Sequence, residues 1–159
     1  MDYLWTPWRY QYVTTAGDAA GCVFCAAAAG DDREQLIVYR GLRAFVILNR
    51  FPYTSGHIMI VPYQHAASML ELPEETLIEM TLLARTSERH LRDVYHPDGL
   101  NLGLNLGKSA GAGIAGHLHL HALPRWTGDT NFMTVVGETR VLPEDLAGTW
   151  ERLRRAFAE

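Results

Sequence analysis

The sequence has few cysteines, little positive charge and no long hydrophobic run, and each shortage excludes a class of protein. Its 159 residues include two cysteines, too few for a disulfide-stapled scaffold, which favours a reducing cytosol. Fourteen basic residues against 18 acidic ones give a net charge of −4. No overall positive field therefore exists to attract a nucleic-acid polymer or an anionic membrane. Any phosphate that the protein binds must be held locally.

The apolar content is that of an ordinary globular domain, with 48% hydrophobic and 20% charged residues. The longest apolar run, 22–29, is far shorter than the roughly 18 residues that a membrane span needs. The start of the chain also lacks the basic and apolar segments of a signal peptide. We therefore expect a cytoplasmic protein with a single domain over residues 1–159, preceded by an irregular, aromatic arm at residues 1–17.

Four segments of the sequence predict β-strands. Residues 36–40 and 43–48 are rich in β-branched and aromatic side chains, and the Gly41-Leu42 pair between them predicts a hairpin. Residues 57–61 lie between turn-forming residues, which predicts a third strand. Residues 100–106 alternate leucine with asparagine or glycine, which predicts a strand with one apolar and one polar face.

Three further segments predict helices. Residues 25–29 precede Gly30, a residue typical of helix ends. A long helix is expected from Pro73 to Pro97, and in it we interpret His90 as a surface residue, with His96 in the loop that follows. The last helix begins at Pro143 and carries one apolar stripe: Leu146, Trp150, Leu153 and Phe157. Strands paired in sequence, with helices between them, predict an α+β fold on an antiparallel sheet of about five strands.

Three histidines alternate with leucines in residues 116–121, which predicts another strand. Successive side chains of a strand point to opposite faces, so His117, His119 and His121 should form a row while Leu118 and Leu120 face the core. Imidazole is both a metal ligand and a catalytic group. Positions about 7 Å apart along one strand converge poorly on one metal ion, whose ligand distances are about 2 Å. The row is better suited to an extended phosphate chain.

A glycine-rich loop at residues 107–113 precedes the histidine row. Its backbone N–H groups can approach phosphate oxygens without obstruction by side chains. The loop contains the pattern Gly-x-Gly-x-x-Gly at residues 111–116. We discard a dinucleotide-binding Rossmann site, because that motif must open a helix and here it opens a strand.

The two cysteines form a Cys22-Val-Phe-Cys25 pair that is half of a tetrahedral zinc site. By itself the pair is equally typical of a redox couple or of two buried thiols. His65 follows the third predicted strand and His117 begins the last one. Those ends approach each other if the two strands run antiparallel, so a Cys₂His₂ site is geometrically reasonable.

The run His117-Leu118-His119-Leu120-His121-Ala122-Leu123 resembles the His-φ-His-φ-His-φ-φ signature of the histidine triad (HIT) nucleotide hydrolases and transferases. The resemblance extends to residues 48–53, 56–62 and 99–105. The tail from Leu123 to Trp126, with Asp129, Asn131 and Phe132, is similar to the bacterial branch that includes diadenosine tetraphosphate phosphorylases.

This resemblance implies a homodimer with a continuous sheet, and an enzyme that cleaves dinucleoside polyphosphates at the α-phosphorus. His119 is implied as the nucleophile that forms a nucleotidyl-histidine, which phosphate or water then resolves. His121 is implied to act near the leaving oxygen, and His57 to support the site.

The resemblance also implies binding residues. Asn49 is expected at the ribose, and the phosphate-binding group comprises Asn105, Ser109, Gly111 and Gly113. Structural zinc is expected on Cys22, Cys25, His65 and His117. The chain has Gly111-Ala112-Gly113-Ile114 where the family commonly has Gly-Gln-Ser/Thr, so backbone N–H groups, with Ser109, are expected to replace a hydroxyl contact to phosphate.

Three other functions stay open from the sequence. A hydrolase that binds zinc through all three histidines of the row would lose activity on chelation. A nucleoside phosphoramidase would use the same nucleophile on a different bond. A nucleotide-binding regulatory module would bind nucleotide without forming product.

Overall fold

The computed structural model describes residues 21–129 and 142–159. The predicted arm at residues 1–17 and the family-like residues Asn131 and Phe132 lie outside this part of the chain. In chain order the elements are α2 (Val23–Ala29), α3 (Asp32–Gln35), β1 (Ile37–Arg40), β2 (Ala44–Leu48), β3 (Ile58–Pro62), the 3₁₀ helix η1 (Met69–Glu71), α4 (Glu74–Tyr95), β4 (Gly99–Leu104), the 3₁₀ helix η2 (Lys108–Ala110), β5 (Leu120–Arg125) and α6 (Leu146–Ala156).

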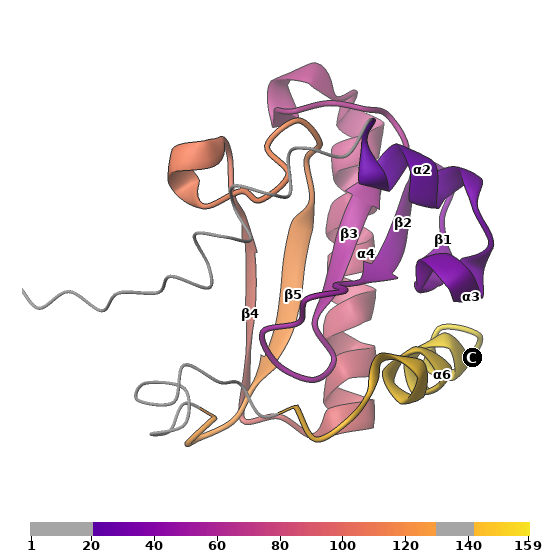
Figure 1. The fold of residues 1–159 in the computed structure, drawn as a ribbon, viewed down its shortest axis with the longest axis vertical. Coiled ribbons are helices and arrows are strands. Elements are labelled where there is room, and N and C mark those ends of the chain that lie inside the picture. Colours follow the sequence, from indigo (N-terminus) through magenta and orange to yellow (C-terminus); the bar gives the residue numbers. More distant parts are fainter. Residues whose placement is uncertain (1–20, 130–141) are drawn as a thin grey trace, which may run out of the picture.

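Five strands form one sheet in the order β1-β2-β3-β5-β4, and all neighbouring pairs are antiparallel. Figure 1 shows the sheet with α4 behind it and α6 across one end. The predicted α+β class and strand number are confirmed. The homodimer with a continuous sheet stays a prediction, and β4, at one end of the sheet, offers the edge for it.

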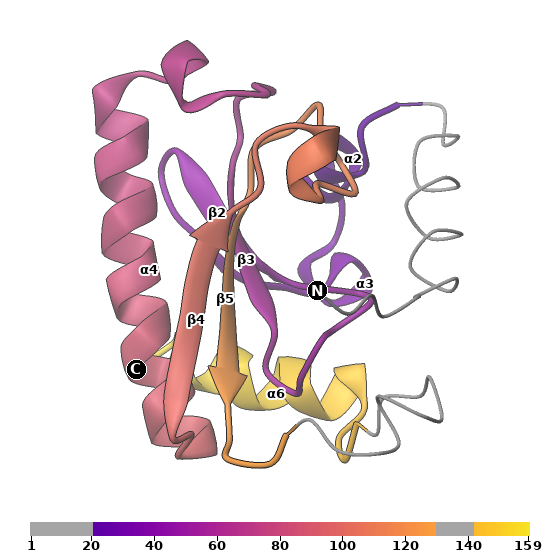
Figure 2. The ribbon, with the colours of Figure 1, turned by 90° about the vertical axis from the view of Figure 1, so that its left-hand side faces the viewer.

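Strands β2 and β3 are buried on both faces, because helices cover both sides of the sheet. Figure 2 shows α4 on one side, with α2 and α3 on the other. In β2, Val46 packs into the core beneath α4, whereas Ile47 packs into a second apolar cluster with Phe24 of α2. The sequences of β2 and β3 are therefore continuous apolar runs and do not alternate apolar with polar residues.

Gly56 is required at the turn that leads into β3. Its φ of +79° lies in the left-handed region, and a Cβ there would lie 2.8 Å from the Tyr95 ring and 3.1 Å from Pro124. A side chain at this position would be strained by both the backbone and the neighbours. The glycine therefore lets the turn pack against α4 and β5.

The predicted helices are present with shifted ends. α2 begins at Val23, earlier than predicted, and ends at Ala29 with Gly30 as its C-cap. α6 begins at Leu146 and not at Pro143, because the Asp145 side chain accepts a hydrogen bond from the Gly148 N–H and so caps the first turn. Helix α3 was not predicted from the sequence; the Asp31 side chain caps it by accepting hydrogen bonds from the N–H groups of Arg33 and Glu34.

The last strand does not begin where the histidine alternation begins. β5 starts at Leu120, so the predicted strand over 116–121 is wrong for its first half. The N–H of Leu118 bonds instead to the carbonyl of Ala66, which follows β3 and lies outside the sheet ladder. The alternation of faces still holds in this extended segment, since Leu118 is buried in the core beneath α4 while His119 faces the other side.

His90 is buried, contrary to the predicted surface position. Its side chain lies against Phe157, with ring centroids 4.5 Å apart, and the residue is 8% exposed. The C-terminal end of α6 covers this part of α4, which the sequence of α4 alone does not reveal. Burial lowers the pKa of His90, and the neighbouring Arg89 lowers it further.

We expect His90 to make stability depend on pH. Since the folded-state pKa lies below the unfolded value, the unfolded chain binds more protons, and stability present above about pH 6.5 is lost as the pH falls. In His90→Phe, the melting temperature should fall less between pH 7 and pH 5 than in the wild type. His96→Asn is the matched control, because His96 is exposed. Equal pH dependence in His90→Phe and the wild type would contradict the assignment.

Among residues 21–129 and 142–159, no helix is long and apolar enough to cross a membrane.

Candidate active site and metal cluster

A pocket of about 530 Å³ lies between α2 and the sheet and contains His119 and His121. This volume is within the range of small-molecule sites, about 300 to 1,000 Å³. Its walls are largely apolar and include Phe24 of α2, Ile47 of β2 and Met59 of β3. Apolar walls of this kind bind a ligand's apolar ring by contact.

The hydrogen bonds of His119 fix which ring nitrogen can react. Its Nδ1 lies 2.8 Å from the carbonyl oxygen of His117. A carbonyl only accepts, so Nδ1 carries the proton and donates. In the neutral ring Nε2 then has a free electron pair. His119 lines the pocket, and the free electron pair on Nε2 is what a nucleophilic imidazole requires.

A second chain of hydrogen bonds fixes His121. The backbone N–H of Tyr53 donates to His57 Nδ1 at 3.2 Å, which places the proton of His57 on Nε2. That Nε2 lies 2.9 Å from His121 Nδ1, so His121 accepts there and carries its own proton on Nε2. His57 is 1% exposed and contacts His121, and its supporting role stays a prediction.

The electrostatics keep these imidazoles neutral. Burial lowers the pKa of His119, against an opposing effect of its bond to the His117 carbonyl. Burial lowers the pKa of His121 to about 4, and the neighbouring His119 adds to the shift. At pH 7 the pocket therefore contains one imidazole with a free electron pair and another with an N–H to donate.

The predicted nucleotide-binding residues divide into two groups. Asn49, Gly111 and Gly113 line the pocket, and Gly111 has a φ of +91° that favours glycine. The Asn49 side-chain oxygen accepts from the Phe51 N–H at 2.9 Å. Asn105 and Ser109 are not among the lining residues, and Ser109 is exposed.

Sequence reasoning missed several pocket residues. Phe24 lies between the two cysteines of the Cys-x-x-Cys pair, and its ring centroid is 5.0 Å from that of His119. Arg50 and Tyr53 lie in the loop after β2 and line the same pocket. The loop's position between Asn49 and His57 was the available signal, because residues between two candidate site residues in a short turn stay near the site.

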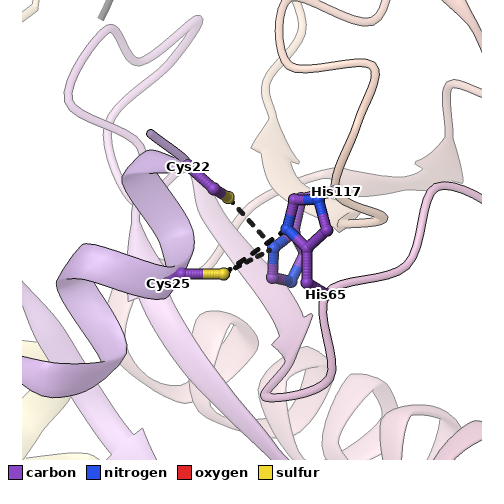
Figure 3. A group of neighbouring side chains, drawn as sticks. All are labelled: Cys22, Cys25, His65 and His117. Carbon is purple, nitrogen blue, oxygen red and sulfur yellow. Dashed lines mark hydrogen bonds between the residues drawn. The ribbon is translucent and has the colours of Figure 1, made fainter. Parts of the chain in front are cut away.

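Both cysteines and two histidines form a cluster of possible metal ligands (Figure 3). The ligand atoms of Cys22, Cys25, His65 and His117 all lie within 4.8 Å of one another. Cys22 Sγ lies 3.2 Å from His117 Nδ1, and Cys25 Sγ lies 3.4 Å from His65 Nδ1. A tetrahedral zinc ion with standard bond lengths separates sulfur and nitrogen ligands by about 3.5 Å. The four side chains therefore fit a tetrahedral metal.

His117 is oriented for this cluster and not for the pocket. Its Nε2 lies 2.9 Å from the carbonyl oxygen of Pro62, so Nε2 donates and Nδ1 is free to bind a metal. The histidine row is thus divided, with one imidazole in the cluster and two in the pocket. Zinc binding by all three histidines of the row does not match this arrangement.

A family model described as the HIT domain matches residues 31–128. The chain belongs to the histidine triad (HIT) family. It is similar to the AP-4-A phosphorylase of Mycobacterium tuberculosis, with 36% identity over 166 residues that cover 99% of this chain and 85% of the relative.

Solved structures of HIT proteins share the fold. A Zn-bound histidine triad family protein from Mycobacterium smegmatis superposes with a TM-score of 0.70 and 31% identity, covering 87% of this chain and 94% of the other. A hypothetical histidine triad nucleotide-binding protein from Sulfolobus tokodaii gives a TM-score of 0.69 and 29% identity, covering 86% and 92%.

Proposed function

We propose that this HIT protein cleaves dinucleoside polyphosphates of the diadenosine tetraphosphate type at the α-phosphorus through a covalent nucleotidyl-histidine on His119. The observation that carries the proposal is the Nδ1–H bond from His119 to the His117 carbonyl, which leaves Nε2 as the nucleophilic atom. Similarity to an AP-4-A phosphorylase over nearly the whole chain supports the substrate class.

In the first step His119 Nε2 attacks the α-phosphorus. The new nitrogen–phosphorus bond forms as the bond to the leaving polyphosphate oxygen breaks, and the electron pair departs with that oxygen. His121 donates a hydrogen bond from Nε2–H to the leaving oxygen or to the phosphoryl group, which stabilises charge that develops in the transition state. We propose the same role for the backbone N–H of Gly113, which lines the pocket, whereas the N–H of Gly111 is already bonded to the Lys108 carbonyl at 3.0 Å.

In the second step an oxygen of inorganic phosphate or of water attacks the same phosphorus. The nitrogen–phosphorus bond breaks, and its electron pair returns to His119 Nε2. When water is the acceptor, its proton is released to the bulk solvent. Each half-reaction thus has its own positioned nucleophile, which is the advantage of covalent catalysis.

The state of His121 favours a polyphosphate over a phosphoramidate. A polyphosphate departs as an anion without needing a proton, whereas an amine leaving group requires one. With a pKa of about 4, His121 is almost entirely neutral at pH 7 and is a hydrogen-bond donor rather than a source of protons.

We propose that the metal in the Cys₂His₂ cluster is zinc. Two thiolates and two imidazoles are a common structural zinc set, and the similar Mycobacterium smegmatis protein is described as Zn-bound. A bound zinc ion would hold α2 against the segments that carry His65 and His117. With four protein ligands, it would serve a structural role and not activate substrate.

Product analysis with diadenosine tetraphosphate tests the proposed reaction. We expect ATP as one product, with ADP as the second when inorganic phosphate is the acceptor and AMP when water is. Reactions are run with and without inorganic phosphate, and adenosine 5′-phosphoramidate is tested in parallel. Turnover of the phosphoramidate alone, or no product from either substrate, would contradict the proposal.

A further inference from the structure

We propose that Phe24 is a positioning residue that couples metal occupancy of the Cys₂His₂ cluster to nucleotide binding at His119. The proposal rests on the proposed function, since it requires the pocket to bind a nucleotide. A bound metal would then strengthen nucleotide binding in the pocket as well as stabilise the fold.

The ring of Phe24 contacts both parts of the divided histidine row. Its centroid lies 5.4 Å from the His117 ring in an edge-to-face arrangement and 5.0 Å from the His119 ring. The residue is 3% exposed and also lines the pocket. One rigid side chain therefore lies between a metal-cluster imidazole and the nucleophilic imidazole.

The position of Phe24 depends on the cluster because of the helix that carries it. Cys22 is the N-cap of α2, and Cys25 lies in the first turn. The helix has seven residues, and the side chain of its N-cap does not bond to the N–H groups of the first turn. So short a helix is unstable by itself in water and depends on tertiary contacts. Metal bonds to both cysteines are therefore expected to restrict α2 strongly.

The restricted helix forms one wall of the pocket. Val23, Phe24 and Ala27 of α2 all line it, opposite Ile47 and Met59 of the sheet. Without metal, α2 is held by its apolar contacts and by cysteine–histidine hydrogen bonds. A nucleotide that enters must then also order this wall, and the entropy lost in doing so weakens binding.

A second route from the cluster to the nucleophile runs through the main chain. His117 supplies Nδ1 to the cluster, while its carbonyl accepts the hydrogen bond from His119 Nδ1. Fixing the His117 side chain therefore also fixes the atom that orients His119. Both routes predict that metal and nucleotide stabilise the same arrangement.

Thermodynamic linkage makes the proposal measurable in two directions. If metal tightens nucleotide binding by some factor, nucleotide must tighten metal binding by the same factor. Allosteric couplings typically amount to about 5- to 150-fold. We expect AMP to bind zinc-loaded protein at least about fivefold more tightly than chelator-stripped protein.

The first test measures both directions in the wild type. Calorimetry gives the dissociation constant of AMP with and without zinc, and competition with a chromophoric chelator gives that of zinc with and without AMP. Equal factors above about five support the proposal. AMP binding that is the same with and without zinc overturns the coupling but leaves the proposed function intact, whereas no AMP binding in either state contradicts both.

The second test assigns the coupling to Phe24. Phe24→Leu keeps an apolar side chain but removes the ring between the two imidazoles, so the two affinity factors should fall. The part that runs through the His117 carbonyl should remain. Phe45→Leu is the matched control, because Phe45 belongs to the same apolar cluster but does not line the pocket. It should keep the wild-type factors. Unchanged factors in Phe24→Leu would overturn the role of Phe24.

Discussion

Replacing His119 with alanine is expected to lower kcat/KM for diadenosine tetraphosphate by about 10⁴-fold or more, as removal of other covalent nucleophiles does. The substitution removes Nε2, the atom that forms the bond to phosphorus, while the apolar pocket walls and Asn49 remain. AMP should therefore still bind. Steady-state kinetics and calorimetry on the same preparation measure the two effects separately.

Two controls make the His119→Ala result specific. His96→Asn removes an exposed histidine that caps α4 and should leave kcat/KM unchanged. His121→Ala should cost less than His119→Ala, about 10²- to 10⁴-fold, because it removes a hydrogen-bond donor and not the nucleophile. Mass spectrometry of the wild type after rapid quenching should show one added nucleotidyl group, absent in His119→Ala. Substantial turnover by His119→Ala would exclude the covalent mechanism.

The metal content of His119→Ala separates the proposal from a three-histidine metallohydrolase. His119 is bonded to the His117 carbonyl and lines the pocket, whereas the cluster ligands are Cys22, Cys25, His65 and His117. The variant should therefore retain the wild-type zinc content. Loss of zinc together with loss of activity would favour the metallohydrolase.

Removing the metal is expected to lower the free energy of unfolding by about 4 kcal/mol when zinc is present at about a thousand times its dissociation constant. For a chain of this size each kcal/mol changes the melting temperature by about 2 to 4 °C, so chelation should lower it by roughly 8 to 16 °C. The physical reason is that an ion on the proposed ligands would join α2 to two distant segments through bonds that exist only in the folded state. Thermal unfolding with and without a chelator measures the change.

Cys22→Ser is the matched control for chelation. It removes one thiolate, so its melting temperature should already be low and should no longer respond to the chelator. A thiol reductant should leave the wild type unchanged, because both cysteines are free thiols. A redox pair would give the opposite pattern, with a response to reductant and none to chelator.

The elements with a regular apolar pattern could be predicted from the sequence, because the spacing of apolar residues shows which face of a helix or strand is buried. The stripe of Leu146, Trp150, Leu153 and Phe157 packs onto the core as predicted. The Pro73 and Pro97 signals delimit α4 to within a residue or two. The burial of Leu118 with the exposure of His119 to the pocket likewise follows from strict alternation.

Errors arose where a neighbour far away in sequence decides the environment. His90 is buried by the end of α6, and no feature of its own helix shows this. β5 begins at Leu120 because the N–H of Leu118 donates its hydrogen bond to the carbonyl of Ala66, which does not belong to a strand of the sheet. The phosphate-binding roles of Asn105 and Ser109 stay predictions, although neither residue lines the pocket.

By itself the sequence determined which residue types are available for chemistry and on which face each histidine of the row lies, since a strand's period of two fixes that locally. The resemblance implied a division of roles within the row, but only the tertiary structure gave the contacts behind it. His117 contacts two cysteines that lie 92 and 95 residues away in the sequence. His57 bonds to His121, which lies 64 residues away. Phe24 packs against the rings of both His117 and His119. Such contacts depend on how the sheet brings distant segments together. The order of residues along the chain does not by itself specify how far apart two distant residues lie in the fold.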